Sequence, residues 1–422
     1  MKNIKNIQKK PQHLPERLTI SFPIWGLYDT DGTGDYADLD KMMREHVERG
    51  FNCIRLDDGA GLMHDLSGKP IPSVKLRGQW GPLTNYIRQA HPYNPGLCDM
   101  RKRLLDMFAA AKKYNIYIVL SSWYFLHTYW MVDDPVLNDG IYAIKPHERY
   151  AAFAKYLHYI LCELEEKDLD SQVAFVEIFN EADGLSFCGG YGNQLNCPEE
   201  ERLRYRNEHI QAIDYLRDKH PKIMFAYDVS YPDVDSCLAP DNVDVFNFHN
   251  YFMWSAYDEF HEDPDRWLRK ERISREDVIH SSNYPDKLPK DWIDRVWFYS
   301  NLDTQKIPEA EQFLTENFLR DIEKYRGKLQ RSMNLIRAHS ENLFPDSLIV
   351  CGEGVTYIGS DELLFEEKCA EYWELLKETV LIYRAHGLWG TVVRTCCGPE
   401  DPVWNMCPEK LLEINNIFRY GK

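Results

Sequence analysis

The feature that most restricts the fold of this 422-residue chain is a regular alternation of strand-like and helix-like apolar segments. Eight short runs rich in aliphatic and aromatic residues are typical of buried strands: Leu18–Ile24, Phe51–Leu56, Ile116–Leu120, Val173–Phe179, Ile223–Tyr227, Val243–Phe248, Leu348–Cys351 and Leu388–Val393. Between them, apolar residues recur every three or four positions, as on a helix with one buried face: Tyr36–Arg49, Asp99–Lys113, Glu148–Glu166, Glu199–Lys219, Glu309–His339 and Leu363–His386. This alternation predicts βα units and a parallel sheet.

The number of strand-like runs decides between two parallel architectures. Eight strands in alternation with helices fit a closed (β/α)8 TIM barrel better than an open doubly wound sheet. No G-x-G-x-x-G or G-K-[ST] turn follows the first strand, which weakens a nucleotide-binding alternative. Gly50 follows the first helical stretch, where a C-terminal glycine is expected. The connection Ser230–Asn242 is short and leaves the least room for its helix.

The chain shows no internal division. It has no repeat, low-complexity tract or Gly/Ser linker, so residues 1–422 are predicted to form one barrel domain. Chemistry in such barrels lies at the carboxyl ends of the strands. Three connections at that end are long and rich in Trp and Tyr: Asp57–Gly96, Trp123–Pro146 and Tyr251–Pro308.

Charge and composition argue against several classes of partner. The net charge of −17 would repel a polyphosphate backbone, so we expect no nucleic-acid partner. No apolar run is long enough to span a bilayer, and the first residues lack the apolar stretch of a secretory signal. We therefore expect a cytoplasmic protein with no membrane partner. The eleven cysteines follow no disulfide framework, and the adjacent Cys396 and Cys397 lack the spacing of metal ligands, so no metal site is predicted.

Two glutamates stand at the ends of predicted strands. The fourth strand ends in Asn180-Glu181 and the seventh in Glu353-Gly354. These strands are on opposite sides of an eight-stranded barrel, so both carboxyl groups would project into one opening. Cleavage of a glycosidic bond needs one protonated carboxyl group and one ionised carboxylate. A glutamate after a strand is often only a favourable charge at a helix N-terminus, but the pair in these two places favours catalysis.

The two motifs resemble those of clan A of the retaining glycoside hydrolases, and most closely of the cellulase-like proteins around glycoside hydrolase family 5. The resemblance extends over nearly the whole chain. It implies that Glu181 is the catalytic acid/base, with Asn180 beside it, and that Glu353 is the nucleophile. It also implies a carbohydrate substrate and no metal or organic cofactor. For a retaining enzyme, the two carboxyl groups should be about 5–5.5 Å apart.

Three further residues support the resemblance. The family pattern Gly-Phe-Asn-x-x-Arg stands here as Gly50 to Arg55, and Arg55 would keep a carboxylate ionised through charge-assisted hydrogen bonds. A structural ion pair is the alternative for Arg55. The family's His-x-Tyr stands as His249-Asn-Tyr251. The resemblance implies that His249 contacts the sugar or the acid/base and that the Tyr251 hydroxyl hydrogen-bonds the nucleophile.

The match is incomplete at two strands. Many relatives end the third strand with a histidine, whereas this chain has Ser121-Ser122-Trp123. At the eighth strand Arg394 stands where relatives often bring a sugar-stacking tryptophan, and Trp404 is the expected substitute. Sugar rings stack their apolar faces on aromatic side chains. The candidate platforms are Trp25, Trp80, Trp123, Trp254 and Trp404, although each is equally well explained as a core residue.

The loop insertion at about 251–308 is expected to shape the opening. Insertions after barrel strands accumulate on the catalytic face, so this one should fold over the opening and narrow it into a pocket. Its tryptophans are Trp254, Trp267, Trp292 and Trp297. A pocket favours chain ends or short glycosides over internal sites.

Two hypotheses follow from the sequence. The first is a retaining glycosidase that cleaves β-linked oligosaccharides or glycosides by double displacement. The second is a cellulase-like carbohydrate-binding protein with little or no hydrolysis, because a fold does not guarantee an activity. A metal-dependent barrel hydrolase is set aside, since no His-x-His follows the first strand. The motifs specify neither the sugar, the linkage nor the oligomeric state.

Overall fold

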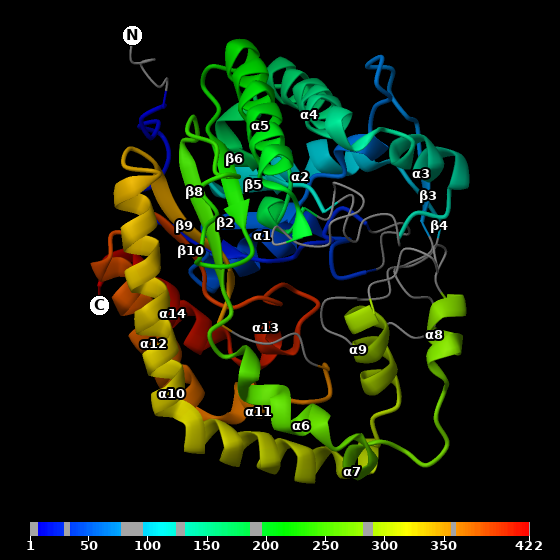
Figure 1. Cartoon of the computed structure of the whole chain (residues 1–422), viewed down its shortest axis with the longest axis vertical. Helices are drawn as coiled ribbons and strands as arrows, with labels where there is room; N and C mark the ends of the chain where they lie inside the picture. The colour runs from blue at the N-terminus through cyan, green and yellow to red at the C-terminus, as the bar shows by residue number, and fades with distance from the viewer. Residues whose placement is uncertain are drawn as a thin grey trace.

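A closed parallel barrel forms the centre of the molecule (Figure 1). The computed structural model describes residues 7–28, 34–76, 96–123, 131–185, 196–281, 290–355 and 360–421. Eight strands pair in the order β1-β10-β9-β8-β7-β6-β5-β2, and β10 closes the barrel on β1. Their bounds are β1 Leu18–Ser21, β2 Cys53–Asp57, β5 Tyr117–Ser121, β6 Val173–Glu177, β7 Phe225–Val229, β8 Val245–Asn250, β9 Leu348–Gly354 and β10 Gly390–Val392. The predicted (β/α)8 fold is confirmed, and each strand overlaps one of the eight predicted runs.

Amphipathic helices surround the barrel as the apolar periodicity predicts (Figure 1). The outer helices are α1 Leu39–Glu48, α2 Met100–Tyr114, α4 Arg149–Glu166, α5 Glu199–Lys219, α10 Ile307–Asn342, α12 Ala370–Ala385 and α14 Pro408–Tyr420. Asp38 and Asp99 cap α1 and α2, because each carboxylate accepts a hydrogen bond from a backbone N–H of the first turn. The predicted stretch 363–386 is divided into α11 Phe365–Lys368 and α12 at Cys369.

The connection from β7 to β8 differs from the prediction. Residues 230–244 contain only turns, bends and irregular backbone, so the helix expected in this short connection does not form. Phe344, which follows α10, packs there instead, with its ring stacked on Phe246 of β8 at 4.4 Å between centroids. The outer face of β8 is thus covered by a residue from a later element.

The long connections add further elements at the carboxyl ends of the strands. The first contains the antiparallel pair of β3 Val74–Leu76 and β4 Gly96–Cys98, and the second contains α3 Pro135–Tyr142. The described elements of the 251–308 insertion are a 3-10 turn at Trp254–Tyr257, α6 Asp258–Glu262, α7 Pro264–Trp267, α8 Arg275–Ser281, α9 Lys290–Ser300 and a 3-10 turn at Thr304–Lys306. Figure 1 shows α6 to α9 grouped below the barrel as drawn.

The insertion has its own small core. Trp267 is fully buried, with its ring centroid 5.1 Å from that of Phe260 and 5.2 Å from that of Phe313 on α10.

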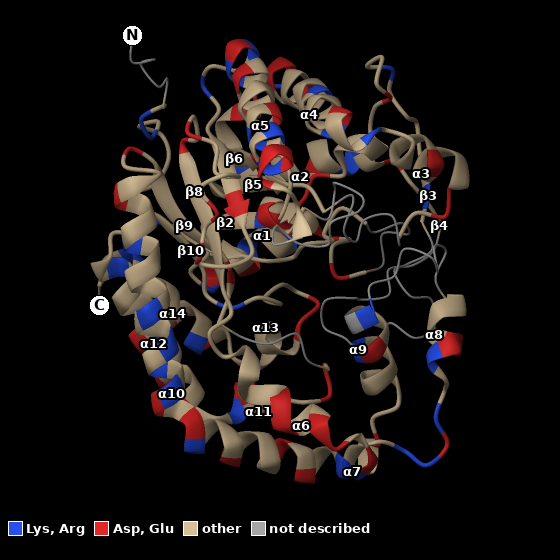
Figure 2. Ribbon diagram, in the orientation of Figure 1, with Lys and Arg blue, Asp and Glu red and all other residues tan. Residues whose placement is uncertain are grey.

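Charge lies mainly outside the barrel. Figure 2 shows acidic and basic residues along α4, α5 and α10, while the barrel strands carry few. Across the described ranges, no helix combines the length and apolar character needed to cross a membrane.

Candidate active site

Glu181 and Glu353 come together at the carboxyl end of the barrel. Glu181 follows β6, and Glu353 is the second-last residue of β9. One carboxylate oxygen of each lies within 4.8 Å of the other and of a ring nitrogen of His249. The Glu181 side chain is 32% exposed and that of Glu353 only 4%, so Glu181 is the more accessible of the two.

Two donors hold the Glu353 carboxylate. Arg55 Nη1 donates to Oε1 at 2.6 Å, and the Tyr251 hydroxyl donates to Oε2 at 2.6 Å. Burial and the nearby Glu353 raise the pKa of Tyr251 well above its ordinary value, so its hydroxyl stays protonated and remains a donor. Both residues were expected within hydrogen-bonding distance of Glu353, and both are.

Arg55 is the centre of a buried charge network. Its Nη2 donates to Glu177 at 2.8 Å, to Asn180 at 2.8 Å and to Asp228 at 3.0 Å. Burial alone would lower the pKa of the guanidinium, but Glu177, Asp228 and Glu353 together raise it, so the group stays charged. A buried cation is tolerated only when it is paired and hydrogen-bonded in this way.

Aromatic rings cover the Arg55 guanidinium. Its central carbon is 4.5 Å from the Trp123 ring centroid and 5.4 Å from that of Phe22. The Trp123 ring in turn packs on that of Trp25, with 6.4 Å between the ring centroids. These cation–π contacts shield the ion pairs from water and strengthen them.

His249 links both glutamates to the network. Its Nδ1 is 3.0 Å from Glu181 Oε1, and its Nε2 is 3.1 Å from Asp228 Oδ1 and 3.6 Å from Glu353 Oε1. Burial disfavours a charged imidazole, but Asp228 and Glu353 outweigh it and raise the pKa of His249 well above its ordinary value. A protonated His249 donates to Glu181, so the acid/base candidate has a proton donor beside it.

A register shift sets the direction of these side chains. The pairing of β8 with β9 slips between Phe248 and His249, so that Phe248 pairs with Cys351 but His249 pairs with Glu353. Such a bulge re-aims the residues that follow it. His249 and Glu353 therefore face each other across neighbouring strands.

The close approach of the Asn247 side chain to Gly352 fixes the inner end of the network. Asn247 Nδ2 donates to Glu177 Oε1 at 2.6 Å, which occupies the oxygen that Arg55 leaves free. A Cβ atom at Gly352 would lie 2.2 Å from Asn247 Nδ2. Only glycine at position 352 lets the amide reach Glu177.

The turn after β6 holds Glu181 by its backbone. Glu181 has a left-handed conformation with φ 49°, and its N–H donates to Asp228 Oδ2 at 3.0 Å. Two residues later, Asp183 accepts hydrogen bonds from the backbone N–H and the hydroxyl of Ser230, both at 2.8 Å. Burial, despite these hydrogen bonds, raises the pKa of Asp183 to about 7.

The expected sugar platforms are only partly accessible. Trp25 and Trp123 are each 1% exposed: Trp123 packs on Arg55, and Trp25 packs on Trp123. The expectation for Trp404 is wrong, because it is fully buried, stacked on Phe51 and hydrogen-bonded through Nε1 to Glu45. Trp254 is 36% exposed, and its ring is 5.4 Å from that of Tyr251. Trp80 lies outside the described residues.

Arg394 is also not at the opening. It is fully buried, donates to Glu366 at 2.9 Å and lies 3.1 Å from Glu367 Oε1. Both carboxylates belong to α11. We therefore correct its expected substrate role: this arginine attaches α11 to the end of the barrel.

Sequence reasoning missed three members of the network, Glu177, Asp228 and Asn247. Each is fully or almost fully buried in a strand that is otherwise mainly apolar. A charged or polar residue inside a buried strand requires a partner, and that requirement was the available signal.

The oxygens of Glu181 and Glu353 with His249 could also surround a cation. Such an ion would compete with the Arg55 guanidinium for Glu353, which disfavours a metal there.

Most of the chain matches the model of one protein family. Residues 24–399 match the model of the family described as sugar-binding cellulase-like. The chain belongs to this cellulase-like family. No curated protein matches it.

Solved structures share the fold of this cellulase-like protein. A presumed glycoside hydrolase from Parabacteroides distasonis has a TM-score of 0.66 and 18% identity, covering 96% of this chain and 94% of that chain. The endo-beta-mannanase/endo-beta-glucanase of Prevotella bryantii has a TM-score of 0.51 and 12% identity, over 99% of this chain and 51% of its own. A broad-specificity endoglucanase from an uncultured bacterium has a TM-score of 0.50 and 11% identity, over 96% and 94%. At these identities the likeness establishes the barrel fold.

Proposed function

We propose that this protein is a retaining glycosidase that cleaves β-linked oligosaccharides or glycosides by double displacement. Glu353 attacks the anomeric carbon while Glu181 protonates the departing oxygen, which gives a glycosyl ester on Glu353. Glu181, now ionised, takes a proton from water, and the resulting attack releases the sugar and regenerates Glu353.

The spacing of the two glutamates is the observation that carries the proposal. Their nearest oxygens lie within 4.8 Å, whereas inverting enzymes separate the carboxyl groups by about 6.5–9.5 Å to admit a water between them. A short gap suits direct attack by one carboxylate.

The partners of the two glutamates suit different roles. Glu353 receives the Arg55 guanidinium and the Tyr251 hydroxyl, which favour the ionised form that a nucleophile needs. Glu181 has a more exposed side chain and contacts His249, whose protonated ring donates a hydrogen bond to it. This division matches the assignment of Glu353 as nucleophile and Glu181 as acid/base.

Azide rescue tests the assignment. The unmodified enzyme is first screened against aryl β-glycosides and defined oligosaccharides. Glu353→Ala should abolish turnover, and added azide should restore part of it and give a glycosyl azide of inverted configuration. Glu181→Ala should keep the first step on substrates with acidic leaving groups, and azide should then give a product of retained configuration. Glu413→Ala, on α14 away from the opening, is the control and should behave as wild type.

Two results would contradict the proposal. Exchanged stereochemical outcomes would mean that the two roles are reversed. Turnover of Glu353→Ala at the wild-type rate, without azide, would remove the double displacement altogether.

A second candidate function is carbohydrate binding with little or no hydrolysis. The family description names sugar binding, and Ser121-Ser122 replaces the histidine that many relatives carry. Calorimetric binding of an oligosaccharide, with no product released over long incubation by the unmodified protein, would favour this candidate.

The proposed compartment is the cytoplasm. Ten of the eleven cysteines lie in the described ranges, all as free thiols, and eight of them are buried. Thiols in this number persist best in a reducing environment. Labelling of thiols in intact and lysed cells tests the location.

A further inference from the structure

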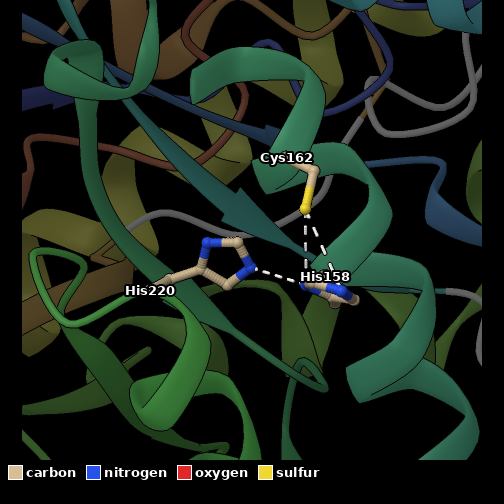
Figure 3. Close-up of side chains that lie close together, drawn as sticks. All are labelled: His158, Cys162 and His220. Atoms are coloured by element: carbon tan, nitrogen blue, oxygen red, sulfur yellow. Dashed lines mark hydrogen bonds between the residues drawn. The ribbon is translucent and has the colours of Figure 1, made fainter. Parts of the chain in front are cut away.

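A second group of chemically reactive side chains lies outside the barrel, between α4 and α5 (Figure 3). His158 and Cys162 are one helical turn apart on α4, so both project from the same face. His220 is the C-terminal cap of α5 and faces them from the neighbouring helix. His158 and Cys162 are partly exposed and His220 is buried, so an ion could enter from solvent.

The spacing of the three side chains is close to that of metal ligands. His158 Nδ1 is 2.8 Å from His220 Nε2, and Cys162 Sγ is 3.6 Å from His158 Nδ1. Tetrahedral zinc, with bonds of about 2.0–2.1 Å to nitrogen and 2.3 Å to sulfur, places its ligands roughly 3.3–3.6 Å apart. The sulfur–nitrogen distance already agrees, and the two imidazoles need to separate by only about 0.5 Å.

A carboxylate orients one of the imidazoles. Glu165 Oε1 is 2.7 Å from Nδ1 of His220, the nitrogen that faces away from the cluster. A proton held on Nδ1 by this carboxylate leaves the Nε2 lone pair directed at His158. Protein ligands of zinc are commonly oriented by such a carboxylate behind the histidine.

The surrounding charge also favours a cation. The carboxylates of Glu165 and Glu166 interact electrostatically with Cys162, against one ammonium group, that of Lys219; a third carboxylate, Glu163, is paired with Arg101 at 2.5 Å. The local field is therefore negative, which stabilises a divalent ion at the thiol.

We propose that His158, Cys162 and His220 bind one zinc ion, with water as the fourth ligand. The thiol loses its proton to solvent when the ion binds, and the proton between the two imidazoles moves to solvent with it. The ion joins α4, which leads into β6, to α5, which follows it. It therefore braces the two helices on either side of β6 in the chain, the strand that Glu181 follows, at a site apart from the proposed chemistry.

Metal titration of the full-length, tag-free protein tests the proposal. Zinc should bind at one equivalent by elemental analysis after removal of excess, and cobalt should give a thiolate charge-transfer band that zinc abolishes. Cys162→Ser should lose the charge-transfer band, and His220→Gln should lower the affinity at least tenfold. Cys237→Ser and His280→Gln, at two sites outside the cluster, are the matched controls and should bind as wild type.

Thermal unfolding separates lost binding from lost folding. Wild type should show a rise in Tm with added zinc, because only the folded chain presents the site. Cys162→Ser should start from a similar Tm without metal and show no rise. No binding by the wild type, or binding that both cluster variants retain, would overturn the proposal and leave the three side chains as a hydrogen-bonded group only.

Discussion

Arg55 and Arg394 form two buried charge clusters at the same end of the barrel, and the contrast between them separates a candidate active site from a structural ion pair. Both guanidinium groups are fully buried and held by glutamates. Arg55 reaches Glu353, which faces Glu181 at the opening. Arg394 reaches two carboxylates of α11, and one of these also accepts a hydrogen bond from the Tyr257 hydroxyl of the insertion.

The comparison teaches that a buried ion pair is not by itself a sign of catalysis. Both clusters are close copies in composition: an arginine, more than one carboxylate and a tyrosine hydroxyl. They differ in what lies beyond the carboxylates. One has a second, more exposed glutamate beside it at the opening, and the other attaches the mostly buried helix α11 to the barrel.

The largest expected effect comes from replacing the two arginines by lysine. Lysine keeps the charge but loses the planar fork of donors, so both Arg55→Lys and Arg394→Lys should lower Tm. Arg55→Lys should also reduce kcat/KM on the order of 100-fold or more, since several charge-assisted hydrogen bonds are lost around Glu353, the proposed nucleophile. Arg394→Lys, scaled to folded protein by circular dichroism, should stay within a few-fold of wild type. Equal losses of activity would erase the distinction.

Asp183 offers a buried carboxyl group without a cation, in contrast to both clusters. Its pKa of about 7 exceeds the ordinary 3.8, so the folded protein binds this proton more tightly than the unfolded chain. The contribution of this bound proton to the free energy of unfolding is fully present below about pH 4 and is lost as pH rises through about 7. At about 1.4 kcal/mol per pH unit, the loss amounts to a few kcal/mol.

Urea unfolding at several pH values measures this effect. The free energy of unfolding of Asp183→Asn, relative to wild type, should increase between about pH 4 and pH 7 and then level off. A difference that stays constant over this range would show that Asp183 is ionised throughout.

The two tyrosines sharpen the comparison further. Tyr251→Phe removes one hydrogen bond to Glu353, and Tyr257→Phe removes one to Glu366 at 3.1 Å. Hydrogen bonds to charged groups contribute about 1.5–3 kcal/mol, so Tyr251→Phe should reduce turnover about 10- to 100-fold. Tyr257→Phe should cost stability and leave kcat unchanged. Steady-state kinetics of both variants decide, and an unchanged kcat for Tyr251→Phe would disprove its assigned role.

Trp254 should give the smallest effect. Its ring is partly exposed beside Tyr251, so stacking on a sugar would contribute about 0.5–1.5 kcal/mol. Trp254→Ala should therefore raise KM a few-fold with little change in kcat. Tyr420→Ala, an exposed aromatic residue on α14, is the control. A KM equal to that of wild type would place the sugar elsewhere.

Local pattern was sufficient to predict the barrel and the residues at its strand ends. The eight strands could be read because each is a short apolar run, and Glu181 and Glu353 because each follows such a run. Arg55 lies inside a run and was found through the family pattern Gly-Phe-Asn-x-x-Arg. The helix between β7 and β8 was misjudged because Phe344, 98 positions beyond Phe246, covers the strand instead.

Side-chain direction accounts for the remaining errors. Nothing in the local sequence distinguishes Trp404, which packs on Phe51 from the other end of the chain, from Trp254 near the opening. The group His158, Cys162 and His220, our proposed zinc site, was not visible in the sequence, because His220 is 58 residues from Cys162 and only the fold brings them together.

The slipped pairing between β8 and β9 has a consequence for how this protein can evolve. Since side chains alternate between faces, loss or gain of one residue in either strand would turn every later side chain to the opposite face. Such an event would turn His249 away from the opening if it fell in β8, or Glu353 if it fell in β9. Insertions and deletions among descendants of this gene should therefore accumulate in the connecting segments and be purged from 245–250 and 348–354, whatever sugar each descendant comes to use.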